Sequence, residues 1–586
     1  MVTAKLQELP KHITQRIAFK AALWIKMDTD EVQTISNPAC KMVNYLAVCQ
    51  SWRHQCIPLY CQEISISFDK KHKTIEESHY WQATMHDVVR VSGQRFVRKV
   101  YLNIPLSQLI NGRFQKLLCL PPHCDSVFPN VQTVSLKLFG SNLDGELANA
   151  ELLESIDMLS KQIKTMFPNG KQLEISSSVL YGSDFPQGIQ DYFDILVSKL
   201  MSGITGLVYN TQREFFERVP LPQVTGLVNI TYMECYKPDP FLQLIFNNRD
   251  TLKSINMELL APKTLARMFS ADRYQLNTEK QNAIMVFERL ERLRIICYEY
   301  GPVQDTRIHI HGAPFPNLKR LVFYHPYIFA SDILFRGNYD KLEYLKLSLD
   351  SEGIERMFED GIFRVERFRA LLYMGMDINL RHQTVSPEFG KQLCHVLWSL
   401  APRRQNLSVD LLSFPYKETF IQELATSAAC DMATQKNSNN QELQSLESIR
   451  YLRIGSLDLD IHETIQILRH LPNISQLKIN PKTIDTNKSR YLQDFVNTKY
   501  VDSAFHQFHP LAPCLRHVLF DQAVYSDMEG ASHFAAILAI LCPKIDSVRW
   551  RMSSGVFEDC CKATAASKAY SKYTERLGLV DWFKGS

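Results

Sequence analysis

Hydrophobic residues recur along this chain in a short phrase: two apolar positions three residues apart, followed by a third two residues further on. A proline pair, Pro-Asn or Pro-Lys, precedes the phrase in copies at residues 128–136, 167–175, 315–323, 471–479 and 542–550. Shorter copies without the proline lie at residues 252–257, 290–295, 342–347, 449–454 and 515–520. The last two apolar residues point to one face of an extended chain, so each copy predicts a strand with one buried face. The proline ends the preceding helix and turns the chain into the strand.

Helical patterns separate these strands. Residues 461–468, for example, carry apolar side chains at a spacing near 3.6. The copies that start at residues 318 and 342 are 24 residues apart, and those that start at 515 and 545 are 30 apart. A unit of one strand and one helix buries its apolar face only against its neighbours, so the pattern predicts a stacked repeat array.

The repeat length and spacing resemble the leucine-rich-repeat superfamily in a divergent form, over residues 96–552. The resemblance implies an α/β solenoid with parallel strands on the concave face and helices on the convex face. The asparagine that normally follows the strand is mostly missing, and a mixed α/β domain with similar strand-starting phrases is the alternative. We expect a polar loop insertion near 429–446, a connecting helical segment at 69–95, and a cap or tail at 553–586.

Residues 1–68 follow a different pattern, with a Leu-Pro start, two isoleucines one turn apart, and a later Leu-x-Val-Cys-x-x-Trp segment. This pattern resembles an F-box, a small three-helix module that docks on a Skp1-like adaptor. The matching positions are Leu9, Pro10, Ile13, Ile17, Leu46, Val48, Cys49 and Trp52. By resemblance, the repeats would hold a substrate for ubiquitination by an SCF-type cullin-RING ligase. Leu9 and Trp52 are 43 positions apart (52 minus 9), longer than usual for the family. The alternative is a helical cap that covers the first repeat.

The residue between the last two apolar positions of each copy must face the opposite way, onto the open strand face. Five of these ten residues are basic, whereas 66 of the chain's 586 residues are. We therefore expect a basic column that binds an acidic or phosphorylated partner segment, as clusters of arginine and lysine commonly do. The candidate substrate-binding residues, including nearby tyrosines and one further arginine, are Arg294, Tyr298, Tyr324, Lys346, Arg453, Lys478, Arg549 and Arg551. The alternative is a set of solvated side chains that keep the strand face soluble.

Composition narrows the class of protein. The chain is 45% hydrophobic, enough for an extensive core, and its formal net charge is only +4, which argues against a bulk nucleic-acid or membrane-surface binder. No apolar run approaches the ~20 residues that span a bilayer, and the N-terminus lacks a signal peptide's apolar region. The 14 cysteines show no paired framework, which favours reduced thiols and a cytoplasmic or nuclear location.

Motifs for chemistry are absent from the sequence. It contains no P-loop, no G-x-G-x-x-G, no G-x-S-x-G and no H-E-x-x-H motif. Cys49, His54, Cys56 and Cys61 fit no standard zinc spacing, and the pair His309 and His311 has no third ligand in view. We therefore expect a non-enzymatic protein-binding adaptor with no catalytic, cofactor or metal site, whose partners are proteins. A repeat scaffold without a ligase connection and an enzyme with a dispersed active site are the rival hypotheses.

Overall fold

The structure is a computed structural model, and the residues it describes fall in segments along the chain. These are residues 57–58, 61–67, 83–84, 88, 92–105, 127–139, 149–177, 195–210, 224–235, 239–259, 286–297, 315–324, 339–350, 368–379, 386–400, 406–412, 414–437, 446–481, 512–521, 538, 542, 545 and 547–551. The F-box-like positions from Leu9 to Trp52, Tyr298 and the predicted tail at 553–586 lie outside them.

The chain divides into two compact units. The first comprises Met1–Met268 and Phe287–Arg292, and the second comprises Phe269–Val286 and Leu293–Ser586. Between residues 99 and 259, and between residues 320 and 551, each strand runs parallel to the strand that follows it in sequence. The architecture is therefore α/β with sequentially paired parallel strands, as the recurring phrase predicts.

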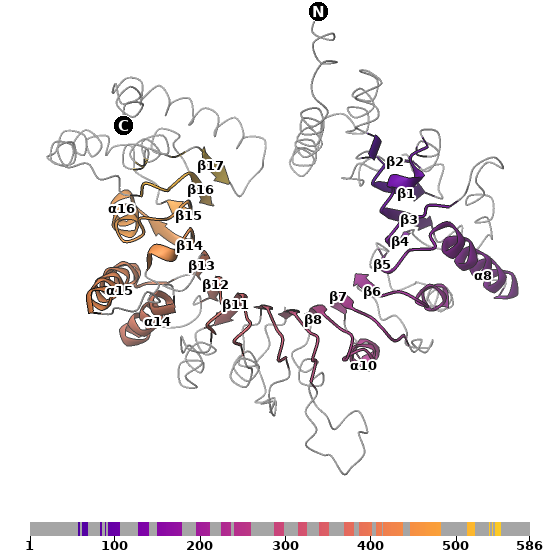
Figure 1. Cartoon of the computed structure of the whole chain (residues 1–586), viewed down its shortest axis with the longest axis horizontal. Coiled ribbons are helices and arrows are strands. Elements are labelled where there is room, and N and C mark those ends of the chain that lie inside the picture. Colours follow the sequence, from indigo (N-terminus) through magenta and orange to yellow (C-terminus); the bar gives the residue numbers. More distant parts are fainter. Residues whose placement is uncertain are drawn as a thin grey trace, which may run out of the picture. The chain divides into compact units, whose positions relative to one another are not determined.

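The first unit contains a row of parallel strands with helices on one side (Figure 1). Its strands are β1 (Glu63–Ser67), β2 (Ala83–Thr84), β3 (Lys99–Pro105), β4 (Thr133–Phe139), β5 (Gln172–Ser177), β6 (Gly206–Asn210), β7 (Asn229–Cys235) and β8 (Ser254–Leu259). Its described helices are the 3-10 helix η1 (Gln94–Phe96), α8 (Asn149–Met166) and α10 (Asp239–Asn247). β1 pairs with both β2 and β3, and from β3 to β8 each strand pairs with the next.

The second unit repeats this arrangement (Figure 1). Its strands are β9 (Arg292–Cys297, of which Arg292 belongs to the first unit), β10 (Arg320–Tyr324), β11 (Tyr344–Asp350), β12 (Tyr373–Asn379), β13 (Asn406–Leu412), β14 (Tyr451–Leu459), β15 (Gln476–Pro481), β16 (His517–Asp521) and β17 (Ser547–Arg551). Its described helices are α14 (Pro387–Leu400), α15 (Lys417–Asn437), the 3-10 helix η6 (Leu446–Ser448) and α16 (Ile461–Arg469). From β10 to β17 each strand pairs with the next.

The core of each unit lies between its strands and helices. The two alternate strand residues that face the helices are buried; on β11, for example, Leu345 and Leu347 are at most 1% exposed. Before the strand, the first apolar residue of the phrase closes a turn onto another buried residue three positions earlier; Leu342 N donates to Tyr339 O at 3.0 Å. On the helix side Trp398 of α14 is fully buried, and its indole N–H donates to Phe420 O at 2.9 Å. The same turn and strand therefore anchor one repeat after another.

All ten predicted strands are present, and the helix predicted at 461–468 is α16. Two expectations need correction. Helix α15 continues to Asn437, so the first half of the loop predicted near 429–446 is helical. Strand β1 pairs with β3, so the sheet already includes residues that the sequence assigned to the N-terminal module.

Candidate functional site

The strand residues that point away from the helices in the second unit form three parallel rows. The register aligns the outward position of the phrase across eight consecutive strands. This central row consists of Val322, Lys346, Gly375, Ser408, Arg453, Lys478, Leu519 and Arg549. We call the central row and its two neighbouring rows the strand face.

The neighbouring rows lie two residues to either side of the central row. The upstream row consists of Arg320, Tyr344, Tyr373, Asn406, Tyr451, Gln476, His517 and Ser547. The downstream row begins with Tyr324, Ser348, Asp377, Asp410 and Gly455. A bulge in β14 then shifts the register, so that Asp458 is paired with Asn480.

Most of the predicted substrate-binding residues share this face. Lys346, Arg453, Lys478 and Arg549 occupy the central row, and Tyr324 occupies the downstream row. Arg551 lies at the far end, paired with Asp521. Arg294 lies on β9, beside β10 in the same sheet.

Two aspartates of the downstream row neutralise two of the predicted cations. Lys346 Nζ lies 3.2 Å from Asp377 Oδ2 on the next strand, and Arg453 Nη2 lies 3.4 Å from Asp410 Oδ2 on the preceding strand. Across β11–β14 the order of charges is thus plus, minus, minus, plus. The expected basic column is interrupted here, because the compensating carboxylates come from other strands and lie one row away.

The electrostatics of Lys346 show how tightly it is held. Burial by itself lowers the pKa of this ammonium group, but a hydrogen bond with Tyr324 and the charge of Asp377 outweigh burial and raise the pKa above its usual value. Its Nζ also lies 4.8 Å from the centroid of the Tyr324 ring. Lys346 is therefore a fixed part of the surface, charged at neutral pH.

Two outward positions that the sequence predicts to be solvated are buried instead. Ser135 is 6% exposed and Val322 is 5% exposed. Long side chains from neighbouring strands extend over Ser135. Over β4, for example, Lys99 of β3 forms an ion pair of 2.6 Å with Glu174 of β5.

Aromatic rings stack along the upstream row. Tyr344 and Tyr373 lie 4.1 Å apart between ring centroids with an interplanar angle of 2°, and the guanidinium of Arg320 lies 4.1 Å over the Tyr344 ring. Burial is the main cause that raises the pKa of Tyr373 to about 12, so its hydroxyl stays protonated at neutral pH. The stack gives the face a rigid aromatic element of the kind enriched at protein interfaces.

Two glycines on the face make room for the ion pairs. A Cβ atom on Gly455 would lie 2.7 Å from Asp410 Oδ2, and one on Gly375 would lie 3.0 Å from Lys346 Cγ. Among the described side chains, Asp377 and Asp410 each also have a buried second oxygen, Oδ1, that accepts no hydrogen bond. The strand face thus combines fixed charges with carboxylates whose hydrogen-bonding capacity is incompletely used.

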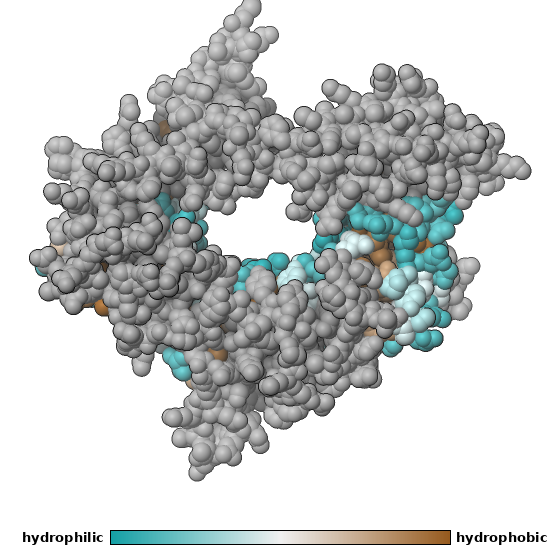
Figure 2. Space-filling view, turned by 180° about the vertical axis from the view of Figure 1, so that it is seen from behind, coloured by the Kyte–Doolittle hydropathy of each residue, from teal (hydrophilic) through white to brown (hydrophobic). Residues whose placement is uncertain are grey.

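One face of the molecule shows the general character of the described surface. The visible described residues are mostly hydrophilic, with hydrophobic residues confined to small patches (Figure 2). In the described segments we find no group of three or more His, Cys, Asp or Glu side chains arranged to hold a metal ion. Burial raises the pKa of the Cys394 and Cys542 thiols to about 12, which keeps them protonated at neutral pH. Within those segments, too, no helix has the length and apolar character needed to cross a membrane.

Comparison with known proteins gives no family assignment. No family model matches this chain. No curated protein matches its sequence either.

Proposed function

We propose that this protein is a non-enzymatic adaptor that binds a protein partner on the strand face of the second unit. One observation carries the proposal: outward side chains from eight successive strands stand in register, so a single extended surface presents them in rows. Rigid tyrosines and fixed ion pairs provide shape and charge contrast for recognition. Repeat arrays use such extended faces for binding.

The charge pattern of the face suggests how a partner is oriented on it. Between β11 and β14 the lysine and arginine are offset by aspartates, so this part favours a segment with mixed or neutral polarity. Acidic or phosphorylated residues of the partner would instead meet β15–β17, where Lys478, Arg549 and Arg551 occupy outward positions.

The connection to ubiquitin ligases rests on the F-box-like residues Leu9–Trp52, which lie outside the described residues. By this resemblance the N-terminal module docks a Skp1-like adaptor, the strand face holds the substrate, and the cullin-RING ligase supplies the catalysis. Such complexes act in the cytoplasm or nucleus, in keeping with the absence of a paired cysteine framework.

Affinity purification of the tagged full-length chain from a native lysate tests this function. We expect a Skp1-like adaptor to co-purify with the wild type and to be lost from the double variant Pro10→Ala, Ile13→Ala. The matched control removes two exposed leucines of the described surface, Leu153→Ala and Leu372→Ala, and should retain the adaptor. If the wild type brings down no such adaptor, the ligase role is wrong and a repeat scaffold without a ligase connection is the better description.

A second arm of the same purification tests the strand face. The double variant Lys478→Glu, Arg549→Glu is expected to lose the substrate while it retains the adaptor, because two cations of the central row become repulsive to an acidic segment. Lys391→Glu reverses a charge on α14, on the helix side of the same unit, and should retain both. Equal substrate recovery from all variants would contradict binding at β15–β17.

A further inference from the structure

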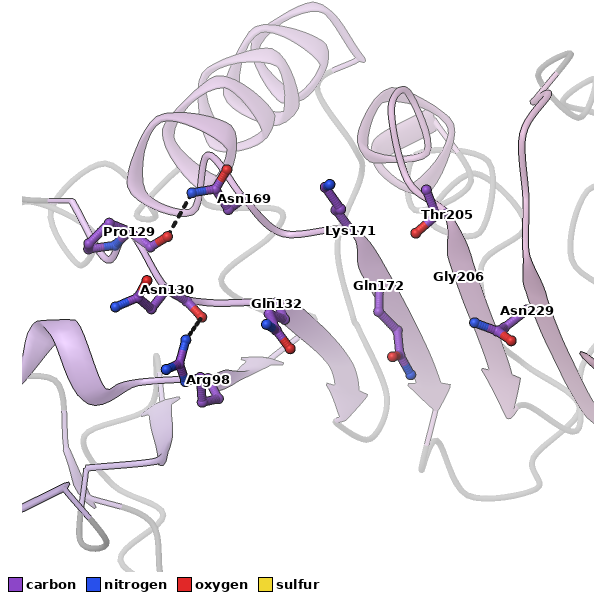
Figure 3. A pocket seen from close by; sticks show the side chains of 10 residues that line it. All are labelled: Arg98, Pro129, Asn130, Gln132, Asn169, Lys171, Gln172, Thr205, Gly206 and Asn229. Atoms are coloured by element: carbon purple, nitrogen blue, oxygen red, sulfur yellow. Dashed lines mark hydrogen bonds between the residues drawn. The ribbon is translucent and has the colours of Figure 1, made fainter. Parts of the chain in front are cut away.

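The first unit contains a polar hollow of about 400 Å³. It lies where the chain enters β4, β5, β6 and β7, so successive repeats contribute to one lining (Figure 3). The lining residues are Arg98, Pro129, Asn130, Gln132, Asn169, Lys171, Gln172, Thr205, Gly206 and Asn229. Its volume falls within the range of small-ligand pockets.

The lining is cationic. It contains the charges of Arg98 and Lys171 and no aspartate or glutamate among the described residues that form it. In the described part of the chain neither cation has a carboxylate partner, whereas the next residue, Lys99, is paired with Glu174. Both cations therefore belong to the lining of the hollow, and no described carboxylate is paired with either of them.

The repeat explains why these two cations line the same hollow. Arg98, Gln132, Lys171 and Thr205 each stand immediately before a strand, at the position whose carbonyl accepts the first two amides of the next repeat. Lys171 and Gln172 N both donate to Gln132 O, at 2.9 Å each. Arg98 and Lys171 are thus two strand spacings apart, about 10 Å between backbones, a gap that their long side chains can close on one group.

Neighbouring amides hold the walls in place. Asn169 Nδ2 donates to Pro129 O at 2.7 Å, which ties one repeat to the one before it (Figure 3). Arg98 Nη1 donates to Asn130 O at 3.5 Å, a long and weak contact that leaves the other N–H groups of the guanidinium for a ligand (Figure 3). Gln132, Thr205 and Asn229 add neutral hydrogen-bonding groups to the lining.

We propose that this hollow binds a phosphate group between Arg98 and Lys171. A planar guanidinium and an ammonium without carboxylate competitors are the side chains that recognise phosphate oxygens. The amide and hydroxyl groups of the lining can serve as additional donors. The site lies wholly in the first unit and does not depend on the function proposed above.

Equilibrium dialysis of the full-length protein with radiolabelled inorganic phosphate, and separately with O-phosphoserine, tests the site at low ionic strength. We expect saturable binding that weakens about tenfold in Arg98→Gln and in Lys171→Gln, because each loses a charge-assisted hydrogen bond. Thr205→Glu places a carboxylate in the hollow and should abolish binding by repulsion. Thermal unfolding of each variant verifies that these surface exchanges leave the fold intact.

The matched control is Lys253→Gln. Lys253 occupies the same position before β8 but does not line the hollow, so its loss should leave phosphate affinity unchanged. Tighter binding of O-phosphoserine would identify a phosphorylated side chain as the ligand, and tighter binding of inorganic phosphate would identify a free anion. Absence of saturable binding by wild type at low millimolar concentrations overturns the proposal, as does equal weakening by the Lys253 variant.

Discussion

At the scale of single residues, glycines at outward strand positions leave space for the long side chains that form ion pairs on the strand face. Gly375 and Gly455 remove the atoms that would stand against Lys346 and Asp410. Each glycine lies in register beside the residue it accommodates, so the missing Cβ on one strand makes room for a charged side chain on the adjacent strand. The sequence predicted the positions of the cations. The roles of the glycines, which make room, and of the aspartates, which pair with the cations, follow only from the strand register.

Gly455→Ala should break this arrangement. The new Cβ would lie 2.7 Å from Asp410 Oδ2, so the carboxylate must move away and loosen its ion pair with Arg453. We expect a loss of about 1–3 kcal/mol in the free energy of unfolding, measured by urea denaturation.

Gly206→Ala is the matched control. Its Cβ would meet nothing closer than Gln172 Cγ at 3.4 Å, an ordinary contact. This exchange should be neutral or stabilising by up to about 1 kcal/mol, because alanine restricts the unfolded chain more than glycine does. Equal stability changes in the two variants would show that the close approach to Asp410 has no energetic weight.

At the scale of elements, the recurring phrase predicted ten of the 17 described strands and missed seven. Five of the missed strands, β3, β6, β7, β12 and β13, lie within the array, and in three of them, β6, β7 and β12, unusual side chains occupy the same spacing. Tyr209 and Tyr232 stand where the phrase normally has leucine or isoleucine, and methionines take both inward places on β12. Tyrosine and methionine indicate a buried strand position less clearly than leucine does. Their spacing, without a preceding Pro-Asn pair, therefore does not predict these strands.

The ends of elements were harder to predict than their existence. Helix α15 continues through a polar segment to Asn437, although its sequence lacks the apolar periodicity of α14. Part of its tertiary support is visible at its start, where Lys417 Nζ forms an ion pair of 2.7 Å with Glu463 of α16. No local pattern predicts this contact, because the two residues are far apart in the chain.

Helix α16 starts with a capping box that supports this contact. The Asp460 side chain accepts a hydrogen bond from Glu463 N at 2.9 Å, and the Glu463 side chain accepts one from Asp460 N at 2.7 Å. Asp460→Ala removes one half of the box and should lower the free energy of unfolding by about 1 kcal/mol. Gln466→Ala, at an exposed position of the same helix, should change it by less than about 0.5 kcal/mol in the same urea titration. Indistinguishable effects of these two exchanges would contradict a stabilising cap.

At the scale of the whole molecule, the two units use one repeat plan for different surfaces. In the first unit, an ion pair between Lys99 and Glu174 spans an intervening strand, and the cationic hollow lies where the strands begin. In the second unit, ion pairs join adjacent strands in the middle of the open face. Both units build their cores from the same kind of turn and strand, with apolar residues at the inward positions of the phrase. The two units differ in the charged residues at their surfaces.

The division into two units predicts that loss of a core side chain destabilises the neighbouring strands of its own unit before it destabilises the other unit. Leu345 of β11 and Leu173 of β5 hold the same place in the phrase and are 1% and 2% exposed. Leu345→Ala should cost about 2–5 kcal/mol and speed amide hydrogen exchange first in β10–β12, because each repeat is stabilised by its neighbours. Leu173→Ala should do the same in β4–β6 and leave β10–β12 protected. Hydrogen–deuterium exchange of both variants, followed by mass spectrometry, distinguishes local destabilisation from a single cooperative unit. In a single cooperative unit, either substitution would raise the amide exchange rates equally in all strands.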